Sequence, residues 1–154
     1  MLERLDEMDR RLLRLLQEDA ARPITELAEL VGLSPSPCWR RIKRLEDAGI
    51  IKDRVVLLDA HALGLELVVF ARVKLSAHGR QALPEFEREI RKYDEVMECY
   101  TVSGMMDYLI RIVTTDVRGY ERFLRDHLLK MPTVHEVHST IALTQVKYST
   151  ALPV

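Results

Sequence analysis

The chain has 154 residues, enough for one ordinary domain or two small ones. Hydrophobic residues make up 47% of it, which suffices for a packed core and excludes disordered, collagen-like and disulfide-dense chains. Lys and Arg number 23 against 24 Asp and Glu, so the net charge of −1 gives no overall attraction to nucleic acid. Apolar runs stay near four residues, and acids occupy the N-terminal stretch 1–6, where a signal peptide would need an apolar core. Two cysteines indicate no reliance on disulfides, so we expect a cytoplasmic protein that does not enter membranes.

The first 50 residues have the apolar spacing of three helices. Hydrophobic residues recur at helical intervals over residues 8–16, and Asp6 and Asp9 stand at the positions of a capping box. Pro23 begins a short second helix, which Gly32 ends because glycine adopts a left-handed conformation at little cost. A short second helix joined by such a tight turn to a third helix predicts a helix-turn-helix.

The third predicted helix begins at Ser34, a capping residue followed by proline. Cys38, Ile42 and Leu45 form its buried stripe, and residues 51–58 are expected to form a β segment that closes the unit. Residues 34–45 contain four cations and no acid, and Ser, Arg and Lys on an exposed helix suit base edges and phosphates. DNA binding is the favoured interpretation, and an ordinary three-helix bundle with a basic surface is the alternative.

The remaining residues alternate between strand and helix patterns. The expected strands cover residues 65–75, 96–102, 108–113 and 134–148, and the expected helices cover residues 84–93 and 117–129. This order predicts a ferredoxin-like βαββαβ domain, an α+β arrangement with one sheet face bare of helices. We therefore divide the chain into a winged helix-turn-helix domain, residues 1–58, and a ferredoxin-like domain, residues 59–154. A second copy of the chain is the simplest cover for the bare face, which predicts a dimer.

Two motifs in this order resemble the Lrp/AsnC family of bacterial and archaeal feast/famine regulators. The first is Leu-Ser-Pro-Ser-Pro-Cys at 33–38, and the second is Ser-Gly-Met-Met-Asp-Tyr-Leu at 103–109. The resemblance spans almost the whole chain. It implies a DNA-binding winged helix-turn-helix, an amino-acid-sensing ferredoxin-like domain, and dimers that assemble further into tetramers or octamers. Double-stranded DNA, a small amino acid and further copies of the chain are therefore the expected partners.

The resemblance also assigns a DNA-contacting surface to the third helix. Arg41 and Arg44 are expected on phosphates, although Arg41 has a structural alternative as an ion-pair partner of Glu46 or Asp47. Trp39 likewise has packing as its alternative. The candidates for the major-groove surface are Ser34, Ser36, Trp39, Arg40 and Lys43.

A free amino acid presents a carboxylate and an ammonium group, and the turn at 103–107 offers a partner for each. Backbone N–H groups beside Gly104 suit the carboxylate, and the carboxylate of Asp107 suits the ammonium. A plain hairpin turn is the alternative. The resemblance places the ligand at this turn, between dimers, and adds contributions from the final strand. The effector-binding candidates are Tyr100, Thr101, Ser103, Gly104, Met105, Asp107, Ser139 and Thr140.

One departure from the family pattern concerns the residue after Gly104. The family usually has an acid there, whereas this chain has Met105 and Met106, which make the loop apolar and adaptable. The sequence therefore favours an apolar or sulfur-containing amino acid as effector, and no cofactor.

Two other classes of protein compete with this interpretation. Some relatives of the architecture decarboxylate sirohaem, but His135 and His138 are three apart on an expected strand and point to opposite faces. Cys99 is expected to act as a small hydrophobic residue rather than a nucleophile. We therefore expect no catalytic residues and no metal site. An architectural DNA-binding protein that senses nothing stays open, because it needs the same basic helix.

Overall fold

The computed structural model describes residues 5–76 and 83–154, which form two compact units. The first unit comprises residues 1–57 and 146–154, and the second comprises residues 58–145. Residues 1–4, part of the acidic stretch considered above for a signal peptide, lie outside the described residues. Among the described helices, none has the length and apolar character needed to cross a bilayer.

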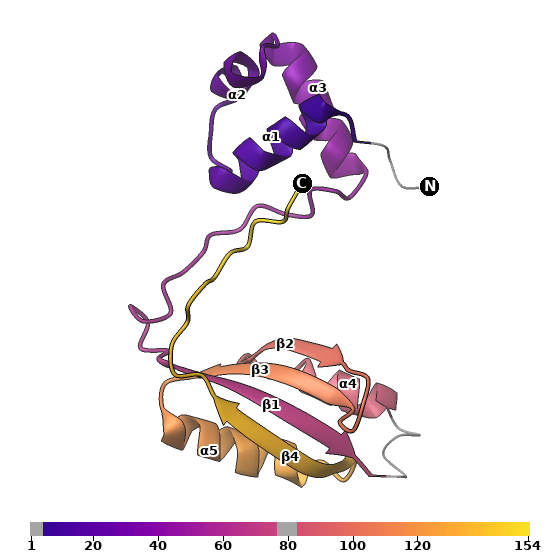
Figure 1. Cartoon of the computed structure of the whole chain (residues 1–154), viewed down its shortest axis with the longest axis vertical. Helices are drawn as coiled ribbons and strands as arrows, with labels where there is room; N and C mark the ends of the chain where they lie inside the picture. The colour runs from indigo at the N-terminus through magenta and orange to yellow at the C-terminus, as the bar shows by residue number, and fades with distance from the viewer. Residues whose placement is uncertain (1–4, 77–82) are drawn as a thin grey trace. The chain divides into compact units, whose positions relative to one another are not determined.

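Three helices make up the folded part of the first unit (Figure 1). They are α1 (Glu7–Glu18), α2 (Ile24–Val31) and α3 (Pro35–Asp47). The expected capping box is present, since the Asp6 side chain accepts from the Asp9 backbone and the Asp9 side chain from the Asp6 backbone. Gly32 has a φ of 71° and ends α2 in the left-handed conformation, as predicted.

The three helices enclose a small apolar core. The predicted stripe of α3 is confirmed, because Cys38, Ile42 and Leu45 are all buried. Ser34 occupies the N-cap of α3, but its side chain makes no capping hydrogen bond. The buried core cluster consists of Leu12, Leu27, Ala28, Val31, Cys38 and Ile42.

The β segment expected over residues 51–58 is not formed in this chain. Those residues are irregular, and Val55, Val56, Leu57 and Leu58 are between 61% and 84% exposed. A strand needs a neighbour for its backbone hydrogen bonds, and the described chain supplies none here. The apolar alternation that suggested a strand is therefore left on the surface.

The end of the chain lies along α1 in the first unit. The Gln17 side-chain amide donates to the Leu152 carbonyl at 3.2 Å and accepts from the Leu152 N–H at 2.6 Å. Arg14 Nε also donates to the Val154 carbonyl at 2.8 Å. These three contacts join residues 135 or more positions apart in the sequence.

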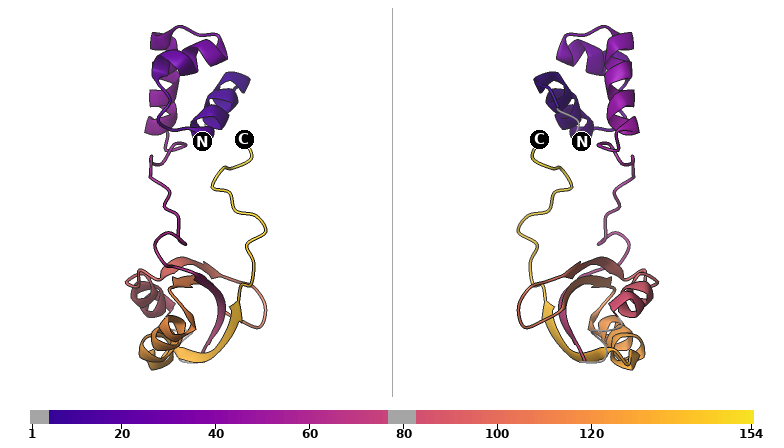
Figure 2. Two further views of the ribbon diagram at one scale, coloured as in Figure 1. Left: turned by 90° about the vertical axis from the view of Figure 1, so that its left-hand side faces the viewer. Right: turned by 90° about the vertical axis from the view of Figure 1, so that its right-hand side faces the viewer.

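The second unit is a four-stranded antiparallel sheet of order β2-β3-β1-β4. Both of its α-helices lie on the same side of the sheet (Figure 2). This is the predicted ferredoxin-like arrangement. The elements in chain order are β1 (Leu67–Leu75), α4 (Leu83–Ile90), β2 (Val96–Thr101), β3 (Tyr108–Thr114), α5 (Val117–Asp126), the 3-10 turn η2 (Leu128–Lys130) and β4 (Val134–Ile141).

The two faces of the sheet differ in burial. Val69, Ala71 and Val73 of β1 are fully buried on the helix-covered side, whereas Phe70 between them is 38% exposed. The register pairs Phe70 with Arg111 on β3 and with Thr140 on β4, so these side chains share the open face. The structure thus contains the bare sheet face that the sequence pattern predicted.

Several elements end earlier than the sequence pattern indicated, among them the helix expected over residues 84–93, which ends at Ile90. The final strand was expected to continue to residue 148, but β4 ends at Ile141, which pairs with Val69 near the start of β1, so residues beyond 143 have no β1 residue opposite them. The helix expected over residues 117–129 ends at Asp126 and is followed by the 3-10 turn η2, a common way for a helix to tighten at its end.

Candidate functional site

The outward surface of α3 presents the side chains that the sequence singled out. The turn between α2 and α3 is closed by a hydrogen bond of 2.8 Å from Leu33 N–H to the Ala28 carbonyl. Trp39 is 56% exposed, so this side chain is not packed into the core of the first unit. The other exposed candidates for the major-groove surface are Ser34, Ser36, Arg40 and Lys43.

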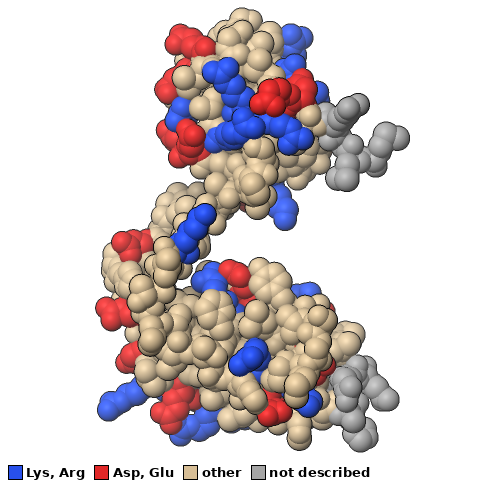
Figure 3. Space-filling model, viewed as in Figure 1, with Lys and Arg blue, Asp and Glu red and all other residues tan. Residues whose placement is uncertain are grey.

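Cations and carboxylates lie close together on the first unit (Figure 3). Lys43 Nζ lies 2.9 Å from Asp47 Oδ1, one turn along α3. This hydrogen bond raises the pKa of Lys43. Within the described part of the chain, Arg40 is the one cation of residues 34–45 without an ion pair. The expected DNA-contacting surface therefore centres on Trp39, Arg40 and Lys43.

Arg41 and Arg44 make ion pairs with α1. Arg41 Nη1 lies 2.7 Å from Asp6 Oδ2 and 2.8 Å from Asp9 Oδ1, and Arg44 Nη2 lies 2.6 Å from Asp9 Oδ2. The Asp9 backbone N–H and then the Arg41 guanidinium lower the pKa of Asp6 to about 2. The pairing of Arg41 with Glu46 or Asp47 that the sequence left open is thus replaced by pairs across two helices. Contacts of Arg41 and Arg44 with phosphates stay a prediction.

The turn of residues 103–107 joins β2 to β3. Gly104 has a φ of 113°, which disfavours any side chain, and Met105 is 85% exposed. Asp107 fastens this turn to β1, because its Oδ2 accepts from Leu75 N–H at 2.7 Å and its N–H donates to the Val73 carbonyl at 2.9 Å. The carboxylate expected to bind an ammonium group thus also has a structural contact.

The other effector candidates do not gather around this turn in one chain. Ser139 shares a hydrogen bond with the Tyr120 hydroxyl of α5, so it lies on the helix-covered side of the sheet, whereas Thr140 lies on the open face. Tyr100 also lies on the open face and donates to Glu98 Oε2 at 3.0 Å, while Thr101 lies on the other side. Because β3 and β1 separate β2 from β4, Tyr100 and Thr140 do not meet within one chain.

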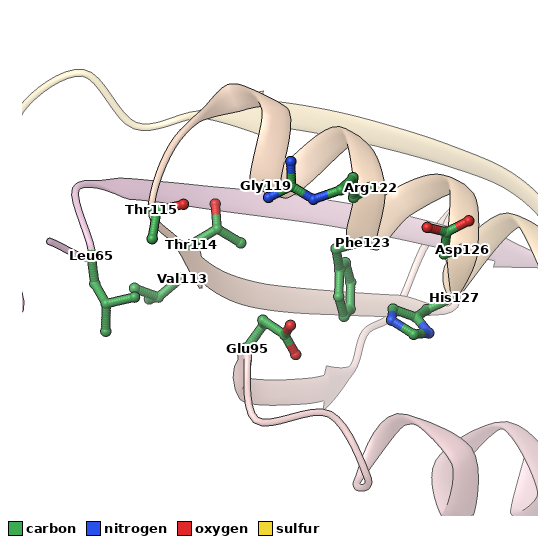
Figure 4. A pocket seen from close by; sticks show the side chains of 10 residues that line it. All are labelled: Leu65, Glu95, Val113, Thr114, Thr115, Gly119, Arg122, Phe123, Asp126 and His127. Carbon is green, nitrogen blue, oxygen red and sulfur yellow. The ribbon is translucent and has the colours of Figure 1, made fainter.

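A separate cavity of about 400 Å³ lies beside α5, at the far end of the β2–β3 hairpin from Gly104 (Figure 4). No sequence pattern marks this cavity, because its polar groups come from β3, α5 and the loops beside them and form no local motif. The His127 ring in its wall packs against the Tyr93 ring at a tilt of 40°, with ring centroids 4.4 Å apart. The lining residues are Leu65, Glu95, Val113, Thr114, Thr115, Gly119, Arg122, Phe123, Asp126 and His127.

The cysteines have the environment of packed hydrophobic residues. Cys38 is fully buried in the first core, and burial raises the pKa of Cys99 to about 11. A thiol with so high a pKa forms little of the nucleophilic thiolate. Among the described residues, no group of three or more His, Cys, Asp or Glu is arranged to hold a metal ion.

These observations define a class of protein, a helix-turn-helix DNA-binding regulator joined to an α+β ligand-binding domain. Family models match both parts: the AsnC-type helix-turn-helix domain over residues 5–46 and the Lrp/AsnC ligand binding domain over residues 68–152. The chain belongs to the Lrp/AsnC family of transcriptional regulators, as the two sequence motifs predicted.

Relatives and solved structures match over nearly the full length. The DNA-binding transcriptional activator DecR of Escherichia coli K12 is 38% identical, and the match covers 97% of this chain and 99% of DecR. The transcriptional regulator of Neisseria meningitidis in complex with L-Met is 38% identical, with a TM-score of 0.91 and 97% of each chain covered. An AsnC family regulator from Agrobacterium tumefaciens is 39% identical, with a TM-score of 0.92 and the same coverage.

Proposed function

We propose that this regulator recognises specific DNA sequences through the exposed face of α3. The observation that carries the proposal is the solvent-facing set of Trp39, Arg40 and Lys43, directly after the turn of the helix-turn-helix. Arginine and lysine donate to guanine edges, and an exposed aromatic ring suits contact with a thymine methyl group. Ser34 and Ser36 at the helix start suit base or phosphate oxygens.

We propose a small amino acid as the effector and the turn of residues 103–107 as its main binding site. Backbone N–H groups around Gly104 would bind the carboxylate. Asp107 would bind the ammonium group through acceptor positions beyond the one used by Leu75 N–H. The exposed Met105 favours an apolar or sulfur-containing side chain. The L-Met complex of the Neisseria meningitidis regulator, at 38% identity, supports this ligand class.

We further propose that the site is completed by a second copy of the chain. Tyr100 and Thr140 share the open sheet face but have two strands between them, so a common ligand needs strands from two copies. Dimers would place two copies of α3 in major grooves about one helical turn, ~34–36 Å, apart. Assembly to tetramers or octamers would let a bound amino acid change DNA occupancy, provided that it binds the assembled states unequally.

The experiment is a screen of the twenty amino acids by thermal shift and light scattering. We expect stabilisation or a change of size with L-Met or another apolar amino acid only. The Asp107→Ala variant should lose that response and keep DNA binding in the absence of amino acid. A retained response in Asp107→Ala would remove this residue as the ammonium partner.

One observation favours a second function, an architectural DNA-binding protein that senses no ligand. Asp107 already accepts a hydrogen bond from β1, which is what a plain hairpin turn requires. DNA binding with no response to any amino acid would establish this alternative. Since the relatives are named as regulators, we propose a non-catalytic role in the cytoplasm, without a cofactor.

A further inference from the structure

The carboxylate of Asp9 is buried between α1 and α3. It is 1% exposed, and each of its oxygens accepts from a different α3 guanidinium, Oδ1 from Arg41 at 2.8 Å and Oδ2 from Arg44 at 2.6 Å. Oδ2 also accepts from the Asp6 N–H at 3.1 Å, which closes the capping box of α1. One buried group therefore joins the start of α1 to two successive turns of α3.

A buried carboxylate is stable only where charged or hydrogen-bonding partners replace its lost hydration. Asp9 has such partners in this arrangement, and any rotation or sliding of α3 against α1 would separate it from at least one guanidinium. Apolar contacts across the same interface are less directional. The ion pairs thus favour one rotational setting of α3 more sharply than its buried stripe of Cys38, Ile42 and Leu45 would alone.

The two arginines adjoin the DNA-facing side chains in sequence. Arg41 follows Arg40, and Arg44 follows Lys43, so both pairs lie on neighbouring flanks of one helix. A roll of α3 that released Arg41 and Arg44 would carry Arg40 and Lys43 through the same angle. Base contacts depend on donor–acceptor geometry and would be lost, whereas attraction to phosphates would persist.

We propose that Asp9 is a positioning residue for sequence recognition, one that sets the orientation of α3 without contacting DNA. The inference rests on the proposed DNA-contacting face of α3. It assigns to the buried carboxylate a contribution to the choice between DNA sequences, separate from its contribution to folding.

The test compares the full-length Asp9→Asn variant with wild type on two duplexes. One is the sequence that wild type enriches from a random pool, and the other is a scrambled duplex of equal composition. We expect Asp9→Asn to lose about tenfold or more of the preference for the enriched duplex. Its affinity for the scrambled duplex should stay equal or rise, because the variant carries one negative charge fewer.

Leu13→Ala is the matched control, because Leu13 is a buried residue of the same helix that makes no ion pair. Measured well below its melting temperature, Leu13→Ala should keep the wild-type preference. An equal loss of preference in Leu13→Ala and Asp9→Asn would reduce the effect to general destabilisation and overturn the proposal. An Asp9→Asn protein that folds and keeps the wild-type preference for the enriched duplex would also overturn the proposal.

Two further variants keep the test decisive. Asp6→Asn removes the charge of a half-exposed partner of Arg41, while the Asn side-chain carbonyl can still accept from the Asp9 N–H as an N-cap. We expect this variant to fold and to lose about threefold of the preference, so it carries the test if Asp9→Asn does not fold. Arg40→Ala examines the DNA-contacting face itself. If Arg40→Ala binds DNA as wild type does, the proposed DNA-contacting face is refuted. If Arg40→Ala loses the preference for the enriched duplex but Asp6→Asn and Asp9→Asn keep it, only the Asp9 proposal fails.

Discussion

The side chain of Asp6 lies at the start of α1, where a backbone N–H and a guanidinium both favour its ionised form. Its pKa falls from 3.8 to about 2 on folding. A carboxyl group with a lowered pKa in the folded state stabilises the protein above its unfolded pKa, and this contribution disappears as the pH falls through the folded pKa. The stability difference between wild type and Asp6→Asn should therefore be largest above pH 4 and shrink toward pH 2. Chemical denaturation across this range measures it, and a constant difference would contradict the assignment.

Arg40 is the residue that matters most to the proposed DNA-contacting face, because Lys43 must leave its contact with Asp47 to bind a base. Arg40→Ala should lower affinity for the enriched duplex by ~1–3 kcal/mol, the usual effect of removing a base contact. Exposed ion pairs are worth ~0–1 kcal/mol, so Lys43→Ala should show a loss of similar or smaller size. Fluorescence anisotropy at fixed salt gives both values. Lys92→Ala, an exposed cation of the second unit, is the control for charge alone.

At the scale of elements, Gln17 and the end of the chain make an unusual pairing. The side-chain amide of Gln17 contacts both the N–H and the carbonyl of Leu152, as a neighbouring strand would. Hydrogen exchange of the Leu152 amide should therefore be slowed in wild type and fast in Gln17→Ala. The amide of Ala151, which bonds to the nearby Ser149 side chain, is an internal reference that should not change. Equal exchange of Leu152 in both proteins would exclude this pairing in solution.

Which elements could be predicted from the sequence depends on where their hydrogen-bond partners come from. The helices and the β2–β3 hairpin have partners nearby in the chain, and capping residues such as Asp6 and Gly32 mark their ends. Residues 51–58 and 143–148 have strand-like composition, yet no partner strand within the described chain, and they stay irregular. Periodicity reports which residues suit a strand and does not report whether a neighbour exists.

The same limit applies to the candidate sites. Exposed residues of one helix, such as Trp39 and Arg40, follow from helical periodicity. The pairs of Asp9 with Arg41 and Arg44 join residues 32 and 35 positions apart, and nothing local marks them. Ser139 and Thr140 were assigned together to the effector site from the resemblance, but adjacent strand residues point to opposite faces, and the structure places them so.

At the scale of the whole molecule, the open sheet face is the surface that we propose for self-association. Phe70 is 38% exposed there and lies next to Arg72 and to Arg111, which pairs with Glu98 at 2.8 Å, so Phe70→Arg would place a further cation beside Arg72 on the proposed contact face. We expect this variant to shift toward the monomer in light scattering. Because two-fold related arginines repel, the shift should weaken as salt is raised.

Leu129→Arg is the matched control for Phe70→Arg, since Leu129 is 58% exposed on η2, away from the open face, and receives the same substitution. It should retain the dimer. Thermal unfolding of both variants separates lost association from lost folding, because a monomer that unfolds cooperatively keeps its core. If Phe70→Arg remains dimeric at low salt, the open face is not the dimer interface, and the exposed apolar segment 55–58 becomes the next surface to alter.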